Sequence, residues 1–201
     1  MTATNPDQRL HFPATARNRD PIADVLQQWL PNWGTILEIA SGSGEHAVEF
    51  QQRFSHLRWQ ASDPDPQHRD SINAWICHTD QTNTMARALD IDVAQHPWPL
   101  PTDVQACLSA IVCINLLHIS SKNCTAALLQ QAAECLPKQA PLMIYGPFKR
   151  YGAHTSLSNA SFDASLRERN IDWGVRDIEW IESLITTCLL YTSPSPRDSD
   201  S

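Results

Sequence analysis

A carboxylate and two glycines lie close together in the stretch from Thr35 to Ala47. An apolar run there leads to the acid Glu38, and small residues that include Gly42 and Gly44 follow, ahead of an amphipathic segment. A glycine lets a ligand approach the backbone where any Cβ would collide, and the first turn of a helix presents free N–H groups. This order of strand, acid, glycine turn and helix predicts a site for a polar, nucleoside-like ligand.

Further polar side chains follow the next predicted strands. Asp63 lies nineteen residues after Gly44, Asp92 follows a third, weaker apolar segment, and Asn115 ends a strongly apolar run. In an open α/β sheet, ligands bind beyond the carboxyl ends of the strands, where the strand order reverses. We expect Asp63 to accept hydrogen bonds from vicinal ribose hydroxyls and Asp92 to accept one from the exocyclic amine of adenine. Glu38, beside the glycine turn, favours a cationic group.

Strands and helices are expected to alternate along the chain, which is typical of an open, mainly parallel α/β sheet flanked by helices. Short apolar runs predict the strands, and apolar residues at helical spacing predict the helices. Asp20-Pro21 and Asp65-Pro66 each indicate an N-cap followed by a proline in the first helical turn. The predicted strands are 35–39, 57–61, 88–91, 108–115 and 142–145, and the predicted helices are 20–30, 45–54, 66–76, 125–136, 158–169 and 177–185.

Both ends of the chain depart from this pattern. Residues 1–19 lack strong periodicity and are expected to form an N-terminal arm, followed by one α/β domain over residues 20–187. Residues 188–201 are rich in Ser, Pro and Asp and begin where another strand is due. We interpret them as a foreign or disordered tail, and we expect the sheet to lack its C-terminal edge strands.

The composition argues against several classes of function. Fifteen basic and twenty-two acidic residues give a net charge of −7, whereas a general nucleic-acid binder needs a basic face. No apolar run approaches the length of a membrane span, and the first residues lack the apolar core of a signal peptide. The six cysteines form no CxxC pair, and the eight histidines show no paired spacing. We therefore expect a cytoplasmic protein with reduced thiols, no metal site, and no nucleic-acid or membrane partner.

A dinucleotide site is the main alternative for the glycine turn. Gly42 and Gly44, followed by Ala47, also fit the nicotinamide-dinucleotide fingerprint, with Asp63 about twenty residues further on. Glu38 at the strand end suits a sulfonium amino acid better than a pyrophosphate. We therefore favour a methyl donor and keep NAD as the alternative ligand.

Tyr145 and Lys149 raise the same alternative, because their spacing imitates the catalytic pair of short-chain dehydrogenases. That pair needs a helix to bring both side chains to one face. Gly146-Pro147 lies between them and prevents a regular helix. The spacing is therefore weak support for an oxidoreductase.

The glycine turn and the acids after it resemble those of the Rossmann-like S-adenosylmethionine-dependent methyltransferases. The first motif of those enzymes runs acid-x-Gly-x-Gly-x-Gly, and Ala40 stands here in place of the first glycine. A closer resemblance, from about Arg17 to about Leu184, is to the methyltransferase-like protein 26 family, long catalogued as a domain of unknown function. Such families usually close the sheet with a hairpin and a Met-Pro-Ala-Asn-Asn-like segment, which this chain lacks. The stretches that carry the resemblance are Arg17-Asn18-Arg19-Asp-Pro-Ile22, Leu37-Glu-Ile-Ala-Ser-Gly-Ser-Gly-Glu-His46, Trp59-Gln-Ala-Ser-Asp63, Asn115-Leu-Leu-His118-Ile, Tyr145-Gly-Pro-Phe-Lys149, Ser158-Asn159-x-x-Phe162-Asp163 and Trp173-Gly-Val-Arg-Asp177.

The resemblance implies an enzyme whose cofactor is S-adenosylmethionine and whose acceptor, a small molecule or a protein, attacks the sulfonium methyl in line. Proximity and alignment supply most of such catalysis, and a base is needed only if the acceptor must lose a proton. The residues implied in cofactor binding are Glu38, Ala40, Ser41, Gly42, Gly44, His46, Asp63, Asp92, Asn115 and Arg17.

His118 and Tyr145 are the predicted catalytic residues, His118 as a general base or an orienting donor. Substrate binding is predicted for four residues on the expected loop after the strand 142–145, namely Lys149, Arg150, His154 and Asn159. Plainer interpretations stay open: His118 as a structural histidine, His46 as a surface residue, and the whole protein as a cofactor-binding regulator without turnover.

Overall fold

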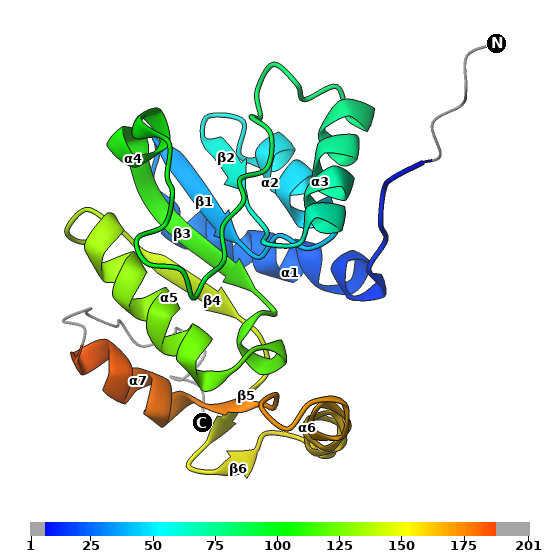
Figure 1. The fold of residues 1–201 in the computed structure, drawn as a ribbon, viewed down its shortest axis with the longest axis vertical. Coiled ribbons are helices and arrows are strands. Elements are labelled where there is room, and N and C mark those ends of the chain that lie inside the picture. Colours follow the sequence, from blue (N-terminus) through cyan, green and yellow to red (C-terminus); the bar gives the residue numbers. More distant parts are fainter. Residues whose placement is uncertain (1–6, 188–201) are drawn as a thin grey trace. The chain divides into compact units, whose positions relative to one another are not determined.

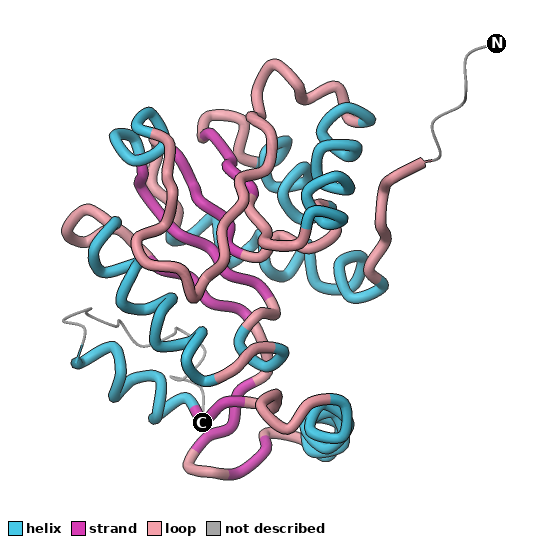
Figure 2. Tube along the Cα trace, viewed as in Figure 1, coloured by secondary structure: helices cyan, strands magenta, loops and turns pink. Residues whose placement is uncertain are grey.

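The computed structural model describes residues 7–187 and divides them into two compact units. The first unit consists of residues 7–116 and 135–145, and the second consists of residues 117–134 and 146–187. Figure 1 shows the elements in chain order, and Figure 2 distinguishes helices, strands and loops.

A four-stranded parallel sheet forms the centre of the first unit. Its strands lie in the order β2-β1-β3-β4, so the chain moves one way from β1 to β2 and the other way from β1 to β3. This reversal makes the carboxyl ends of β1 and β3 the expected ligand edge of the sheet. Every residue of β1 is buried, as is typical of a central parallel strand. The strands are β1 (Thr35–Ile39), β2 (Arg58–Ala61), β3 (Leu108–Ile114) and β4 (Leu142–Tyr145).

Three helices share an apolar core with this sheet: α1 (Pro13–Trp29), α2 (Glu45–Arg53) and α3 (Pro66–His78). Phe50 of α2, Trp59 of β2 and Ile72 of α3 are at most 1% exposed, and the rings of Phe50 and Trp59 lie 5.3 Å apart. A short helix, α4 (Thr102–Cys107), leads directly into β3. The core therefore holds α2 and α3, the two helices that begin just beyond β1 and β2.

The second unit combines helices with a small mixed sheet in the order β6-β5-β7. β5 pairs antiparallel with β6 and parallel with β7. Arg176 of β7 is 5% exposed and donates to the backbone carbonyls of Leu117, Ser120 and Asp172, which ties the sheet to its neighbouring turns. The elements are η1 (Leu117–Ile119), α5 (Lys122–Cys135), β5 (Phe148–Arg150), β6 (Ala153–His154), α6 (Leu157–Arg169), β7 (Arg176–Asp177) and α7 (Ile178–Thr187).

The predicted α/β fold with a mainly parallel sheet is confirmed, and most predicted elements lie within a few residues of the observed ones. The N-cap expected at Asp65 is also confirmed, because its carboxylate accepts from the backbone N–H of Gln67 at 2.8 Å, with Pro66 in the first turn. These features depend on local sequence, and local sequence was sufficient to predict them.

The predicted start of the first helix at Asp20-Pro21 is wrong. Helix α1 begins seven residues earlier, at Pro13, and Pro21 lies in its interior. An interior proline removes one helical hydrogen bond, but Thr15, Ile22 and Leu26 on the buried side of the helix compensate by packing into the unit. Residues 13–19 therefore belong to a helix and not to an arm.

The predicted third strand over 88–91 is also wrong. Only one isolated parallel bridge forms there, between Ser62 and Leu89. The backbone N–H of Ala88 donates instead to the side-chain oxygen of Asn73 at 3.0 Å, and Met85 is drawn into the core. Asp92 thus follows a bridge and not a full strand.

The segment after β4 is not the loop that the sequence predicted, because β5 and β6 form a hairpin there. Its two-residue turn, Tyr151-Gly152, has positive φ at both positions, 50° and 75°. That geometry matches the twist of a hairpin, but Tyr-Gly is not one of the dipeptides that usually indicate a hairpin turn. Lys149, Arg150 and His154 therefore lie on strands, and Asn159 lies in the first turn of α6.

The tail predicted at 188–201, which includes Cys188, lies outside the described residues, as do residues 1–6. Within residues 7–187 the parallel sheet ends at β4, and no helix is both long and apolar enough to cross a bilayer. The five cysteines of this range are free thiols.

Candidate cofactor site and acceptor residues

The turn between β1 and α2 is built from alternating left-handed residues. Ala40, Gly42 and Gly44 have φ values of 57°, 58° and 91°. The Ser41 N–H donates to the Ser62 carbonyl at 2.8 Å, which fixes the turn against the end of β2. Ala40, in the position where the methyltransferase motif has glycine, thus adopts a conformation that costs an L-residue about 1–2 kcal/mol.

Gly44 is required by the packing of the two helices. A Cβ at Gly44 would lie 2.7 Å from the Cα of Ile72, in α3. Backbone cannot yield at that distance, so α2 can approach α3 only if this position is glycine. Gly42 has a different neighbour: a Cβ there would lie 3.0 Å from a ring carbon of Phe12.

Glu38 points to its neighbouring strand in a fully buried site. Its carboxylate accepts from the indole N–H of Trp59 at 2.7 Å, and its side chain is 1% exposed. Burial raises the pKa of this carboxyl to about 7, although the hydrogen bond from Trp59 opposes the rise. The Glu38 carbonyl also accepts from the hydroxyl of Ser62 at 2.7 Å. Glu38 therefore joins β1 to β2 at the base of the predicted site.

Asp63 connects the glycine turn to the start of α3. One of its carboxylate oxygens accepts from the Gly42 N–H at 2.9 Å, and the other receives the Asp65 N–H at 3.0 Å and lies 3.1 Å from Nδ1 of His68. The residue is 4% exposed. Because a carboxylate offers about four acceptor positions, one position on the oxygen that faces Gly42 is left for a ligand hydroxyl.

The structure brings Glu38, Ser41, Gly42 and Asp63 together, as the sequence predicted, at the carboxyl ends of β1 and β2. Asp92 is not part of that hydrogen-bonded group: it is exposed, and its carboxylate caps the Ala94 N–H at 2.9 Å.

Asn115 follows β3 with a φ of 60°, and its N–H donates to the Tyr145 carbonyl at 2.8 Å. Its side chain is intermediate in exposure. It therefore marks the carboxyl end of the β3–β4 pair, the part of the sheet edge next to the strand reversal.

His46 and Arg17 lie on the helical layer. Nε2 of His46 is 2.9 Å from the amide oxygen of Asn18, and its ring stacks on Phe50 at 5.4 Å. Burial lowers the pKa of His46 to about 4, and its 7% exposure makes the surface alternative wrong. Arg17 is exposed on α1.

Several residues at the turn were not predicted, namely Phe12, Ser43, Glu45, Ser62 and His68. Glu45 accepts from the Ser43 hydroxyl at 2.9 Å and from the Phe12 N–H at 2.8 Å. Ser43 and Glu45 stand inside the quoted motif, so an acid in the first helical turn was the available signal. Phe12 and His68 reach the turn from other segments, and their spacing carries no such signal.

Two of the four predicted substrate-binding residues converge on a buried acid of the second unit. Asp163, on α6, is 5% exposed, and its carboxylate lies 3.0 Å from Nζ of Lys149 and 3.3 Å from Nε2 of His154. Arg167 and the backbone N–H of Val175 also bind it. Burial alone would raise the pKa of Asp163, but these donors, Lys149 first, hold it below its usual value. The site carries more positive than negative groups.

Arg150 and Asn159 do not join that cluster through a hydrogen bond to Asp163. Arg150 is exposed on β5, and the Asn159 side-chain amide donates to the Thr155 hydroxyl at 2.8 Å. Asn159 thus stabilises the N-terminal turn of α6.

The two predicted catalytic residues lie in different units. His118 is 6% exposed in η1, with its ring edge-on to Phe162 at 5.4 Å. Burial lowers the pKa of His118 to about 4, and the charge of Arg176 lowers it further, so the imidazole is neutral at pH 7. Tyr145 ends β4 in the first unit and is 41% exposed. A neutral imidazole and an exposed phenol are compatible with proton transfer.

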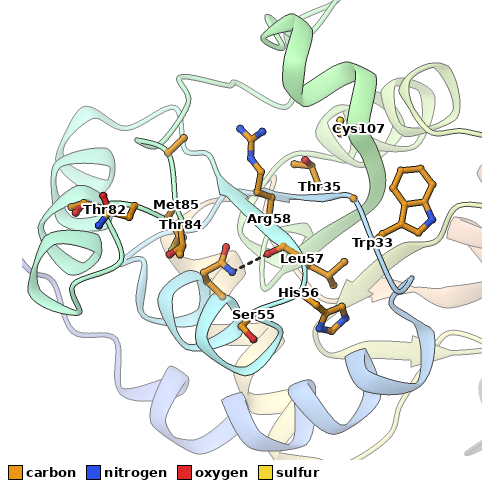
Figure 3. Close-up of a pocket in the computed structure, with 14 residues that line it drawn as sticks. Trp33, Thr35, Ser55, His56, Leu57, Arg58, Thr82, Thr84, Met85 and Cys107 are labelled. Carbon is orange, nitrogen blue, oxygen red and sulfur yellow. Dashed lines mark hydrogen bonds between the residues drawn. The ribbon is translucent and has the colours of Figure 1, made fainter.

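A cavity of about 750 Å³ lies at the other end of the parallel strands (Figure 3). Thr35, Arg58 and Cys107, at or before the starts of β1, β2 and β3, line it together with Trp33. Arg58 pairs with Asp103 at 2.8 Å. None of the predicted site residues lines this cavity, so it is separate from the glycine turn.

Comparison with known proteins gives the family and the fold of this chain. The profile of a family described as "Protein of unknown function (DUF938)" matches residues 9–192. Among solved structures, an O-methyltransferase family protein from Burkholderia thailandensis is 16% identical, with a TM-score of 0.71 over 90% of this chain and 53% of its own.

Two further solved structures also share the fold of this chain. An O-methyltransferase family 2 protein from Planctomyces limnophilus, in complex with apigenin, is 19% identical, with a TM-score of 0.70 over 90% of this chain and 55% of its own. Human N-acetylserotonin methyltransferase, in complex with S-adenosylmethionine, is 11% identical, with a TM-score of 0.68 over 87% of this chain and 46% of its own. This chain therefore has the fold of methyltransferases and spans about half the length of these structures.

Proposed function

This chain belongs to the DUF938 family of proteins of unknown function, and we propose that it is an S-adenosylmethionine-dependent methyltransferase. One observation carries the proposal: the buried Asp63 carboxylate is fixed by the Gly42 N–H at the strand ends next to the reversal of the sheet. An acid held there, with one acceptor position left, suits a ribose hydroxyl.

The chain's own residues would hold the donor in three ways. Asp63 would accept from the ribose, Asp92 from the adenine amine, and the turn from Ala40 to Gly44 would lie against the amino-acid part. Glu38 supports the turn from below through Trp59 and Ser62. When bound, S-adenosylmethionine supplies an electrophilic methyl group, so the task of the protein is to align an acceptor with it and exclude water.

We assign acceptor binding to the second unit, where Lys149 and His154 surround Asp163. An excess of positive groups there favours a polar or anionic part of a small molecule or of a protein side chain. His118, uncharged at pH 7, is the proposed proton acceptor for acceptors that must lose a proton, and Tyr145 is the proposed orienting hydroxyl. The net charge of −7 supports an acceptor other than nucleic acid. We also propose that the protein has no membrane partner.

Two finer assignments belong to the same proposal. The motifs from Arg17 to Asp177 support membership of the methyltransferase-like protein 26 family. Free thiols throughout residues 7–187 support a cytoplasmic location.

The secondary structure removes one of the two observations behind the NAD alternative, the spacing of Tyr145 and Lys149. Tyr145 ends β4 and Lys149 lies in β5, so the two side chains do not share a helix face as the short-chain dehydrogenase pair requires. A regulator that binds the donor without turnover stays the second candidate. It is favoured by the burial of His118, which at 6% exposure presents little of its imidazole to an acceptor.

Calorimetric titration with S-adenosylhomocysteine, and separately with NAD, tests the proposal. We expect the first ligand alone to bind, and we expect Asp63→Ala to weaken it by about 1–3 kcal/mol, roughly 5- to 150-fold. Asp103→Ala removes an exposed carboxylate at the other end of the sheet and serves as the matched control. Binding of NAD alone, or unchanged affinity in Asp63→Ala, contradicts the assignment. A screen of acceptors with His118→Ala then separates an enzyme from a regulator.

A further inference from the structure

A short N-terminal segment, residues Arg9–Phe12, lies across α3 and the start of α2, and we refer to it as the strap. The Leu10 N–H donates to the Ser71 hydroxyl at 2.8 Å, and the Leu10 carbonyl accepts from the indole N–H of Trp75 at 3.0 Å. The Arg9 guanidinium lies 4.9 Å from the Trp75 ring centre. The strap corresponds to the blue segment beside α3 in Figure 1.

The end of the strap reaches the glycine turn. The Phe12 N–H donates to Glu45 at 2.8 Å, and His11 pairs with the same carboxylate at 3.2 Å. The Phe12 ring lies edge-on to His68 at 5.8 Å between ring centres, and His68 in turn contacts Asp63. The strap therefore ends over the residues that hold the proposed donor site.

The Phe12 ring occupies the space above Gly42. A ring carbon lies 3.0 Å from the position that a Gly42 Cβ would take. Allowing ~1.5 Å for a Cα–Cβ bond, that carbon is within about 4.5 Å of the Gly42 Cα. A ligand between the ring and the turn would need about 7 Å, twice a carbon–carbon contact distance. The ring and a ligand on this side of Gly42 thus exclude one another.

We propose that the strap is a plug on the donor site, with Phe12 covering Gly42 until the donor displaces it. The inference rests on the proposed function, because it concerns access to the same turn. The strap is held by three hydrogen bonds, to Ser71, Trp75 and Glu45, and by the contacts of Arg9 with Trp75 and of His11 with Glu45. Phe12 is 40% exposed, so its ring can leave Gly42 once these contacts open. The apparent affinity for the donor is then the affinity of the open site multiplied by the open fraction.

Removal of the ring tests this directly. Calorimetry with S-adenosylhomocysteine on Phe12→Ala should give roughly 5- to 30-fold tighter binding than on the wild-type protein, the range expected for losing a half-buried aromatic contact that competes with the ligand. Trp29→Ala removes an aromatic side chain of similar exposure, 42%, from α1, and should leave the affinity unchanged. Trp75→Phe keeps an aromatic ring but loses the hydrogen bond to the Leu10 carbonyl. It should tighten binding of S-adenosylhomocysteine less than Phe12→Ala does.

Hydrogen exchange gives an independent readout. Saturation with S-adenosylhomocysteine should speed exchange at the Leu10 and Phe12 amides, because a displaced strap loses its bonds to Ser71 and Glu45. A strap that closes over the ligand as a wall would instead slow that exchange.

The outcomes separate the two proposals. Equal or weaker binding by Phe12→Ala, or slower exchange on binding, overturns the plug while leaving the donor site intact. Binding by Phe12→Ala but not by the wild-type protein supports a strongly closed plug. Absence of binding by both proteins overturns the donor site and the plug together.

Discussion

The buried carboxyl of Glu38 makes the stability of this fold depend on pH in an unusual direction. Glu38 is 1% exposed and its hydrogen-bond partner, Trp59, is uncharged. Burial therefore disfavours the carboxylate and favours the protonated acid. The substitution Glu38→Gln replaces the titrating group with a neutral one of the same shape whose carbonyl still accepts from the indole.

The sign and size of this pH dependence follow from the pKa values of Glu38 in the unfolded and in the folded chain. The ordinary value of 4.5 applies to the unfolded chain, and the folded protein raises it to about 7. Between those values the folded protein holds the proton more tightly, so this contribution is fully present below pH 4.5 and is lost as the pH rises to 7. At 1.36 kcal/mol per pKa unit, the loss amounts to about 3 kcal/mol.

Urea unfolding of the wild-type and Glu38→Gln proteins between pH 4.5 and 8 measures the difference. His46 and His118 have pKa values lowered to about 4, so their contribution to the free energy of unfolding rises with pH over part of this window. Both proteins contain these histidines, so their contribution cancels when the two stabilities are subtracted. We expect the stability of Glu38→Gln relative to wild type to increase by about 3 kcal/mol across the range.

Glu49→Gln is the matched control for this series. Its carboxylate is 34% exposed, so this variant makes the same chemical change outside the buried site, and a pH trend that both variants share would not be due to the burial of Glu38. Parallel curves for Glu38→Gln and wild type would refute the reasoning, because they would mean that the folded protein holds the Glu38 proton no more tightly than the unfolded chain does.

Two further predictions concern the turn and the second unit. Ala40→Gly should stabilise the protein by about 0.5–1 kcal/mol in urea unfolding, since the left-handed strain of Ala at φ 57° exceeds the extra entropy of glycine in the unfolded chain; a loss of stability would show that the strain is absent. Asp163→Asn should destabilise the fold by about 1–3 kcal/mol, because Lys149, His154 and Arg167 then face one another without their shared anion. Asp172→Asn, on an acid outside that cluster, is the comparison, and equal stability of the two variants would contradict a central role for Asp163.

The sequence by itself determined the order of strand, acid, glycine turn and helix, the Asp65-Pro66 helix start, and the meeting of Gly42 with Asp63. These features are encoded over short distances: turn residues, caps and apolar periodicity specify the elements, and parallel strands bring their carboxyl ends to one edge. The acid at Asp63 could therefore be placed next to the turn without knowledge of the tertiary structure.

Only the tertiary structure decided the contacts between segments distant in the chain. The strap reaches Gly42 from thirty residues away, and no spacing rule predicts that Phe12 is its neighbour. The strands β6 and β7 have two residues each and exist through their pairing with β5. The charge at Asp163 is set by groups from β5, β6 and α6. Such contacts depend on which surfaces remain to be buried after the local elements have formed, and this is a property of the packed chain.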